Sequence, residues 1–175
     1  TMRQLDAVGF EAVCVNMRGH GFGNPIRSNR LYTARADNDL REVCERIRLS
    51  RRPPALYAVG FSMGANQLLN FLGAGGGSAH INAAVSVSCP FDLNKLGVHF
   101  RSGMARIYGF LVAQPLKRML LQGRHHLQLS HTQLLAGLSC TSVEQFDRHV
   151  QVPLLGLTSV DEYWRASSCV HHIHK

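Results

Sequence analysis

The sequence lacks acidic residues over one long stretch, and it lacks several patterns that mark particular classes of protein. No Asp or Glu occurs between Asp92 and Glu144. No apolar run approaches the ~20 residues of a membrane span, and the first residues have neither the charged start nor the apolar middle of a signal peptide. The five cysteines are an odd number without C-x-x-C spacing, which argues against a disulfide framework or a zinc site. Buried free thiols and an intracellular location, cytoplasmic or at a membrane surface, are therefore predicted.

The acid-free stretch also concentrates the positive charge of the chain. With neutral histidines, 19 Lys and Arg against 11 Asp and Glu give a net charge of +8. A basic surface can attract nucleic acid, anionic lipid or an anionic substrate, or it can simply be solvated. The sequence has no RNA-binding signature and no basic stripe interleaved with aromatics, so nucleic acid is not a predicted partner. The basic residues of the stretch are Lys95, Arg101, Arg106, Lys117, Arg118 and Arg124.

Residues 1–90 alternate between helical and strand patterns. The short apolar, β-branched run at 10–17 is typical of a buried strand. Asp37 or Asn38 can cap the second helix. The alternation predicts an α/β fold in which helices flank both faces of a parallel sheet. The predicted helices are 1–9, 37–49 and 63–72, and the predicted strands are 10–17, 55–60 and 81–89.

Residues 91–168 contain helical patterns only. Two short helices are predicted at Val143–His149 and Ser159–Ser167, capped by Ser142 and Ser159 with Gln145 and Glu162 as capping-box partners. A helical insertion after a strand suggests a lid over the carboxyl edge of the sheet. The predicted division is a core at 1–90, a helical lid at 91–168 and a tail at 169–175.

The most informative motif is VGFSMGAN at 59–66, in which G-x-S-x-G lies between a predicted strand and a predicted helix. That is the context of a nucleophile elbow, where a sharp turn exposes the serine hydroxyl. Glycines at 60 and 64 are expected to avoid clashes between the strand and the helix. The Met63 N–H and the helix N-terminus would face a developing oxyanion. The alternative is a glycine-lined turn whose serine only caps the helix.

Several sequence blocks in the same order resemble the α/β-hydrolases, and specifically the YheT-like branch that includes the plant embryogenesis-associated esterases. The match runs nearly end to end and is more specific than the elbow alone. The blocks are NMRGHG at 16–21, AVGFSMGAN at 58–66, AAVSVSCPFDL at 83–93, EQFD at 144–147 and SVDEYWRASS at 159–168.

The resemblance implies a serine hydrolase that acts on short- and medium-chain acyl esters or acylglycerols and uses no cofactor or metal. Ser62 is the implied nucleophile and Met63 the donor of one oxyanion N–H. The resemblance also implies an internal fragment, truncated at both ends. The second oxyanion donor, the catalytic Asp and His, and a central strand between 10–17 and 55–60 are then expected outside the chain.

Two further expectations follow from this reading. The apolar and basic lid would admit an acyl chain and rest on anionic lipid headgroups. The alternative to a serine hydrolase is a catalytically incompetent fragment that binds acyl ligands or partners as a scaffold. A third interpretation is an enzyme that transfers the acyl group to an alcohol instead of water.

Local residues that could replace the expected partners are each better explained in another way. His20 matches the turn after the first predicted strand, and Asp92, directly after the third, more plausibly caps the lid or pairs with a base. A frayed, truncated tail explains His171, His172 and His174, which otherwise could offer a base or ligate a metal. Surface polarity explains the lid histidines His125, His126 and His131. The glycine loop 73–78 follows a helix and lacks the Lys-Ser/Thr ending of a phosphate-binding loop.

Overall fold

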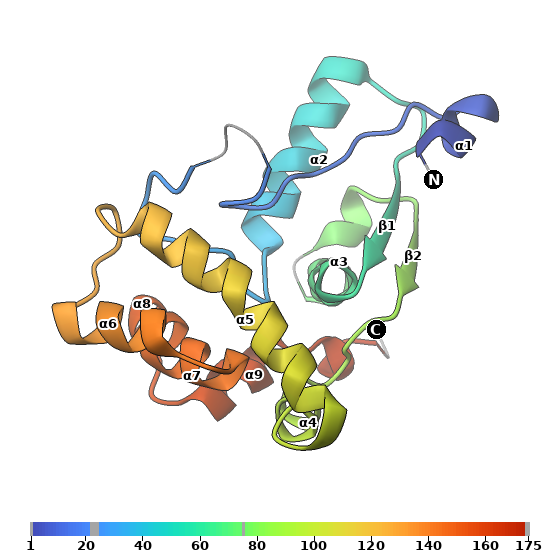
Figure 1. Cartoon of the computed structure of the whole chain (residues 1–175). Coiled ribbons are helices and arrows are strands. Elements are labelled where there is room, and N and C mark those ends of the chain that lie inside the picture. Colours follow the sequence, from blue (N-terminus) through green and yellow to red (C-terminus); the bar gives the residue numbers. More distant parts are fainter. Residues whose placement is uncertain (1, 22–24, 75, 174–175) are drawn as a thin grey trace.

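A two-stranded parallel sheet organises the N-terminal half of the molecule (Figure 1). The structure is a computed structural model that describes residues 2–21, 25–74 and 76–173. Strand β1 (Tyr57–Phe61) pairs with β2 (Ala83–Val87), in register from Tyr57↔Ala83 to Phe61↔Val87. The crossover between them runs through α3 (Met63–Gly73) and the short η1 (Gly77–Ala79). The predicted parallel pairing of these two segments is confirmed.

Helices cover one face of this sheet. Helix α3 packs on both strands, and α2 (Asp37–Arg51) packs on α3. The opposite face of β1 is open within the described residues, because Tyr57, Val59 and Phe61 are 54%, 49% and 56% exposed. The prediction of helices on both faces therefore does not hold for the part of the chain that the structure describes. The buried residues between α2, α3 and the start of β2 are Cys44, Leu68, Phe71 and Ile81.

The predicted strand at 10–17 is wrong. Helix α1 (Met2–Ala7) ends, as expected, just before Gly9, which has a φ of +86°. Residues 10–17 then belong to no strand. The Phe10 ring packs edge-on against the Tyr57 ring, with centroids 5.8 Å apart. A strand needs a neighbour that completes its ladder of hydrogen bonds. No segment among the described residues supplies one.

The predicted cap of α2 is also wrong. The N-cap position is Ala36, and no side chain caps the helix. Asp37 lies inside the first turn, where its carboxylate accepts a hydrogen bond from Arg35 Nε at 2.7 Å. An acidic residue in the first turn still interacts favourably with the helix dipole.

Helices alone follow β2 in the described part of the chain. Ser142 and Ser159 cap their helices as predicted, accepting hydrogen bonds from Gln145 N at 3.2 Å and Glu162 N at 3.1 Å. The Gln145 and Glu162 side chains reach back one residue further than expected, to the N–H groups of Thr141 and Thr158. The helices are α4 (Leu93–His99), α5 (Gly103–Gly123), α6 (His131–Ser139), α7 (Val143–Phe146), the π-helical η2 (Asp147–Gln151), α8 (Val152–Leu155), α9 (Val160–Ser167) and the short η3 (Cys169–His171).

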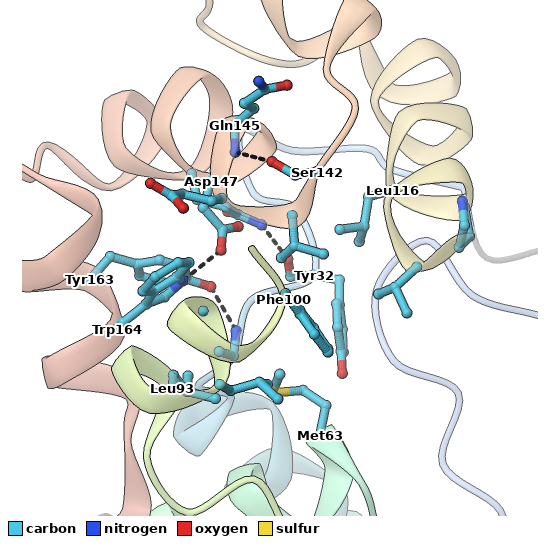
Figure 2. A pocket seen from close by; sticks show the side chains of 18 of the residues that line it. Tyr32, Met63, Leu93, Phe100, Leu116, Ser142, Gln145, Asp147, Tyr163 and Trp164 are labelled. Carbon is cyan, nitrogen blue, oxygen red and sulfur yellow. Dashed lines mark hydrogen bonds between the residues drawn. The ribbon is translucent and has the colours of Figure 1, made fainter. Parts of the chain in front are cut away.

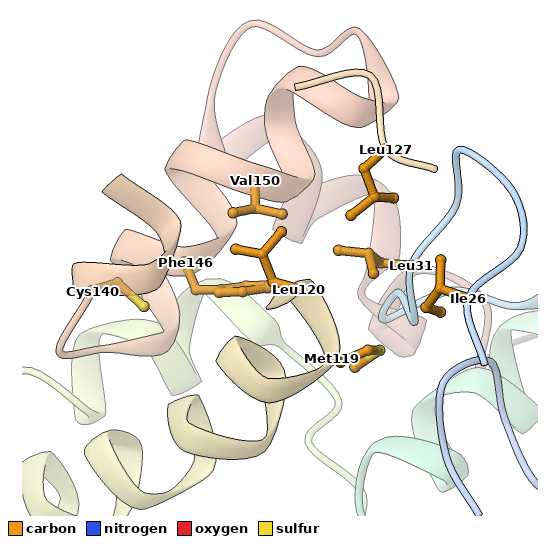
Figure 3. Packing of buried hydrophobic residues seen from close by; sticks show 8 residues of the cluster. All are labelled: Ile26, Leu31, Met119, Leu120, Leu127, Cys140, Phe146 and Val150. Atoms are coloured by element: carbon orange, nitrogen blue, oxygen red, sulfur yellow. The ribbon is translucent and has the colours of Figure 1, made fainter. Parts of the chain in front are cut away.

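Helices α5 to α8, which belong to the predicted lid, share a hydrophobic core with the loop that precedes α2 (Figure 3). Leu120 of α5, Phe146 of α7 and Val150 of η2 are fully buried, and Ile26 and Leu31 pack on the same cluster. The loop and the lid, far apart in sequence, are therefore held together by apolar packing. The predicted boundaries at residues 90 and 168 remain predictions.

Candidate active site

Ser62 occupies a strained turn between β1 and α3. Its φ of 50° and ψ of −122° lie outside the regions that residues with a side chain normally adopt. Its N–H donates to Val87 O at 2.9 Å, which ties the turn to β2. The side chain is exposed and makes no capping hydrogen bond to α3. The alternative of a serine that only caps the helix is therefore wrong.

The two glycines of the motif are under different constraints. A Cβ added at Gly60 would lie 2.7 Å from Ala65 Cα and from Gly64 O, which confirms that close packing of strand and helix requires glycine there. A Cβ added at Gly64 would meet nothing within 4 Å. The expected steric need for glycine at 64 is not found, because that side of the helix start faces open space.

Met63 begins α3 directly after Ser62. The first N–H groups of a helix have no partner within the helix, and the positive end of the helix dipole lies at the same place. The backbone N–H of Met63 is thus suited to donate a hydrogen bond to a negatively charged oxygen beside Ser62. The role of Met63 as an oxyanion donor stays a prediction.

A buried amide holds the second turn of α3 in place. Asn66 is fully buried, and its Nδ2 donates to Ala34 O at 2.9 Å and to Ser167 O at 2.8 Å. Its Oδ1 accepts a hydrogen bond from Cys169 N at 3.0 Å, and Asn70 donates to the same Ser167 O at 2.8 Å. The helix that carries the elbow is therefore joined to the loop before α2 and to the end of the lid. We call Asn66 and Asn70 the amide clamp.

A cavity of about 400 Å³ lies between the elbow and the lid (Figure 2). Met63 and Leu93 line its lower part in Figure 2, and Phe100 and Leu116 line the side toward α5. Its volume is within the range of small-molecule sites. The lining is mainly apolar, which suits a hydrocarbon chain. Polar lining residues gather near α7 and η2, and these are Thr141, Ser142, Glu144, Gln145, Asp147 and Gln151.

One wall of the cavity contains a buried carboxyl group. Asp147 is 6% exposed, and its Oδ2 accepts a hydrogen bond from Trp164 Nε1 at 2.8 Å. Burial raises the pKa of Asp147 to about 7, although the hydrogen bond from Trp164 opposes the shift. Tyr163 beside it is buried too, accepts a hydrogen bond from Ala34 N at 2.8 Å, and has a raised pKa chiefly because of burial. The lid end is thereby fixed to the loop before α2.

Asp92 and His20 have the local roles expected of them. The Asp92 side chain caps α4, accepting from Lys95 N at 3.1 Å, and its carboxylate pairs with the Lys95 ammonium at 3.7 Å. His20 Nδ1 lies 3.0 Å from Arg18 O, and the ring packs edge-on against Tyr32 with centroids 4.8 Å apart. His20 does line the cavity. Neither side chain is hydrogen-bonded to Ser62.

The histidine tail lies at the other end of α3. A Cβ at Gly73, the last residue of α3, would be 2.5 Å from the His172 Cβ. At 1.5 Å per residue, that end is about 15 Å from Ser62, so His172 is not placed to act on it. His171 is exposed in η3, and His174 lies outside the described residues. Among the residues that the structure describes, no histidine or carboxylate is hydrogen-bonded to the Ser62 hydroxyl.

The described ranges contain neither a cluster of metal-ligating side chains nor a membrane-spanning helix. There, no group of three or more His, Cys, Asp or Glu side chains is placed to hold a metal ion. None of the helices described has the length and apolarity needed to cross a membrane.

Sequence reasoning missed the amide clamp and the Asp147–Trp164 pair as parts of one site. Asn66, Asp147 and Trp164 lie in sequence blocks that resemble the family, and Asn70 does not, so those blocks were the available signal. Their partners are 17 to 103 residues away in the chain, however. Spacing within a motif contains no information about such distant contacts.

Comparisons with known proteins agree with this geometry. A family model for the alpha/beta hydrolase fold matches residues 1–148. Embryogenesis-associated protein EMB8 of Picea glauca is 28% identical, over 91% of this chain and 36% of its own length. Monoacylglycerol lipase of Saccharomyces cerevisiae is 29% identical over 94% of this chain and 38% of its own, and the putative esterase YheT of Escherichia coli is 26% identical over 95% and 49%. No solved structure matches the chain.

Proposed function

The chain belongs to the α/β-hydrolase fold family, and from that premise we propose that Ser62 is the nucleophile of a carboxylic ester hydrolase. The proposed substrates are short- or medium-chain acyl esters or acylglycerols. The chain spans 36–49% of the length of the three relatives above. We accordingly place the histidine base and its acidic partner outside these 175 residues.

The proposed reaction is acyl transfer through a covalent intermediate. The Ser62 hydroxyl attacks the acyl carbonyl as the histidine takes its proton, and the Met63 N–H stabilises the oxyanion. The alcohol leaves with that proton, and water then releases the acid from the serine. An acyl chain extending from Ser62 would lie in the cavity beyond Met63, against Leu93 and Leu116.

The observation that supports this function best is the backbone of Ser62, because residues held in a strained conformation are typical of functional sites. A serine that only ended a strand would not need a φ of 50°. Strain of this kind costs about 1–3 kcal/mol, and here the hydrogen bond to Val87 and the close packing at Gly60 offset it. The result is an exposed hydroxyl at the start of a helix.

A fluorophosphonate probe tests the nucleophile directly. We expect labelling and ester hydrolysis in a protein that contains this chain together with the missing base. Ser62→Ala should remove the labelling and lower kcat by about four to six orders of magnitude. The matched control is Ser86→Ala, an exposed serine that pairs in register with Gly60 on the next strand. Labelling that survives in Ser62→Ala would exclude Ser62 as the nucleophile.

A binding function without catalysis is the second candidate. It is favoured by one observation, that the Ser62 hydroxyl has no histidine or carboxylate partner in the described part of the chain. The only tryptophan, Trp164, lines the cavity, so its fluorescence reports on an acyl ligand there. Serine-dependent labelling of the 175-residue chain itself would exclude this candidate.

Filling the cavity separates specific binding from adsorption. We expect a medium-chain fatty acid to change Trp164 fluorescence saturably, and Val112→Phe to weaken that response because Val112 lines the cavity. Leu111→Phe adds the same bulk one residue earlier, where the side chain is 58% exposed. Equal responses of the two variants would mean that the ligand binds elsewhere.

We further propose that α5 rests on an anionic lipid surface. One face of α5 lines the cavity through Val112 and Leu116. On another face, Met104, Ile107, Tyr108 and Leu111 recur at helical spacing and are 54–79% exposed. The helix contains no Asp or Glu, and Arg118 and Arg124 form no ion pair with a carboxylate within the described ranges. An apolar face with basic neighbours is typical of helices that lie in a lipid interface.

Vesicle sedimentation at low salt tests the lipid proposal. More protein should sediment with vesicles that contain phosphatidylserine than with neutral phosphatidylcholine vesicles. Leu111→Asp should reduce this binding, whereas Leu49→Asp, at a 78% exposed position on α2, should not. Equal sedimentation with both vesicle types, or an exposed face that instead drives self-association, would contradict the proposal.

A further inference from the structure

Two cysteines that are far apart in sequence meet at the end of β2. Cys89 Sγ and Cys169 Sγ are 3.6 Å apart, and both are free thiols. Eighty residues separate them in the chain. Cys169 is fully buried in η3, whereas Cys89 is only half-buried. One partner is therefore reachable from solvent and the other is not.

The backbone around this pair is held in place by hydrogen bonds on both sides. Val170 N donates to Phe91 O at 3.0 Å, and Leu93 N donates to Ser168 Oγ at 2.9 Å. Cys169 N also donates to the amide clamp through Asn66 Oδ1 at 3.0 Å. In Figure 1 the C-terminal segment, in red, passes beside the chain that leaves β2. The two segments thus already run together before any covalent bond forms.

Closing the pair into a disulfide needs only a small movement. The sulfur atoms must approach from 3.6 Å to about 2.05 Å. Rotation of the two side chains can supply most of this distance, because the flanking backbones are already in contact. A similar closure is not available to Cys14, Cys44 or Cys140, for which the described residues record no sulfur–sulfur contact.

We propose that Cys89 and Cys169 are a redox-sensitive pair. A low-molecular-weight disulfide such as oxidised glutathione would oxidise them to a reversible disulfide with each other. The Cys89 thiolate attacks one sulfur of oxidised glutathione, forming a mixed disulfide and releasing one glutathione thiolate. The Cys169 thiolate then attacks the Cys89 sulfur and releases the second glutathione. Overall, two protein thiols are oxidised to one disulfide, and one oxidised glutathione is reduced to two molecules of glutathione.

The order of the two steps follows from exposure. Cys89 reacts first because the oxidant can reach it, whereas Cys169 is covered. Burial, together with the contact to Cys89, raises the pKa of Cys169 to about 12. Its thiolate fraction, and with it the rate of the second step, should rise about tenfold per pH unit between pH 7 and pH 9.

The disulfide would fasten the lid end to the strand next to the elbow. Ser62 N is bound to Val87 O, two residues before Cys89, and the amide clamp holds Ser167 and Cys169 from the other side. The bond would close a loop of about 80 residues. A loop of that length removes much conformational freedom from the unfolded chain. Oxidation is therefore expected to raise the thermal midpoint by several degrees.

The test uses the reduced 175-residue chain, incubated with oxidised glutathione at pH 8, alkylated and digested with trypsin. Mass spectrometry should find one dominant linked pair, between the peptides that contain Cys89 and Cys169, and dithiothreitol should reverse it. In guanidinium the pairings should spread over all five cysteines. Cys169→Ser should leave Cys89 as the mixed disulfide with glutathione, and Cys14→Ser should change nothing.

Three results would overturn the proposal. The first is a native wild-type chain in which Cys89 stops at the mixed disulfide. The second is a linked pair that involves Cys14 or a second molecule, and the third is a Cys89–Cys169 bond no more frequent in buffer than in guanidinium. The readout does not depend on ester hydrolysis, so failure of the proposed enzymatic function would not affect it.

Discussion

The two sides of the elbow differ in how tightly they are packed. On the strand side, Gly60 lies against α3 so closely that a single added carbon would meet Ala65 Cα at 2.7 Å. On the helix side, a carbon added to Gly64 would meet nothing within 4 Å. Both glycines belong to one five-residue motif, yet only the first is fixed by contacts in this chain. A motif therefore does not tell which of its positions is constrained by packing.

The largest effect is expected at the packed side. Gly60→Val places a branched side chain against the α3 backbone, which cannot shift without moving the elbow, so the chain should not fold. Far-ultraviolet circular dichroism and the thermal transition measure this. Val59→Thr, at the neighbouring position on the open face, is the control and should fold. A folded Gly60→Val variant would contradict the close packing described here.

The next largest effect concerns the buried carboxyl group of Asp147, which accepts a hydrogen bond from Trp164. Folding raises the pKa of Asp147 from about 3.9 to about 7, so the folded state binds the proton more tightly than the unfolded state. The stability that this tighter proton binding gives the folded state is lost as pH rises from about 4 to about 7. Between pH 5 and pH 8 the loss is about 3 kcal/mol.

Asp147→Asn keeps an acceptor for Trp164 but cannot ionise. We expect the variant to lose this part of the pH dependence, so that its free energy of unfolding falls less between pH 5 and pH 8 than that of the wild type. Urea unfolding at the two pH values measures the difference. Asp161→Asn, on the same lid but exposed on α9, is the matched control. Parallel pH profiles for wild type and Asp147→Asn would rule out the raised pKa.

The amide clamp of α3 supplies the third test. Asn66→Ala removes hydrogen bonds to Ala34, Ser167 and Cys169 and leaves buried partners unsatisfied. It should destabilise the fold by about 2 kcal/mol. Gln122→Ala, on an exposed part of α5, should change stability little. A loss no greater than that of the control would show that the clamp is not rigid in solution.

The smallest effect belongs to the open side. Gly64→Ala should be tolerated and should stabilise α3 by up to about 1 kcal/mol, because alanine is the better helix former and has space there. The thermal midpoint reports the gain. A destabilised Gly64→Ala variant would contradict the open space at this side of the helix start.

The elbow and the sheet pairing could be predicted from sequence because their signals are local. Glycine spacing, the apolar run before Ser62 and the serine caps at Ser142 and Ser159 all depend on neighbours within a few residues. The strand predicted at 10–17 failed because a strand depends on a partner, and the described residues offer none. The cavity, the amide clamp and the Cys89–Cys169 contact could not be predicted, since each joins segments that only the fold brings together.

The backbone of Ser62 has an evolutionary consequence. A φ of 50° is easily adopted by glycine but disfavoured for serine. Selection for stability alone would therefore replace this serine. Under the function proposed above, its presence in a costly conformation is a record of selection for a reactive hydroxyl. That record persists in the geometry whether or not a given chain still contains every group that the reaction needs.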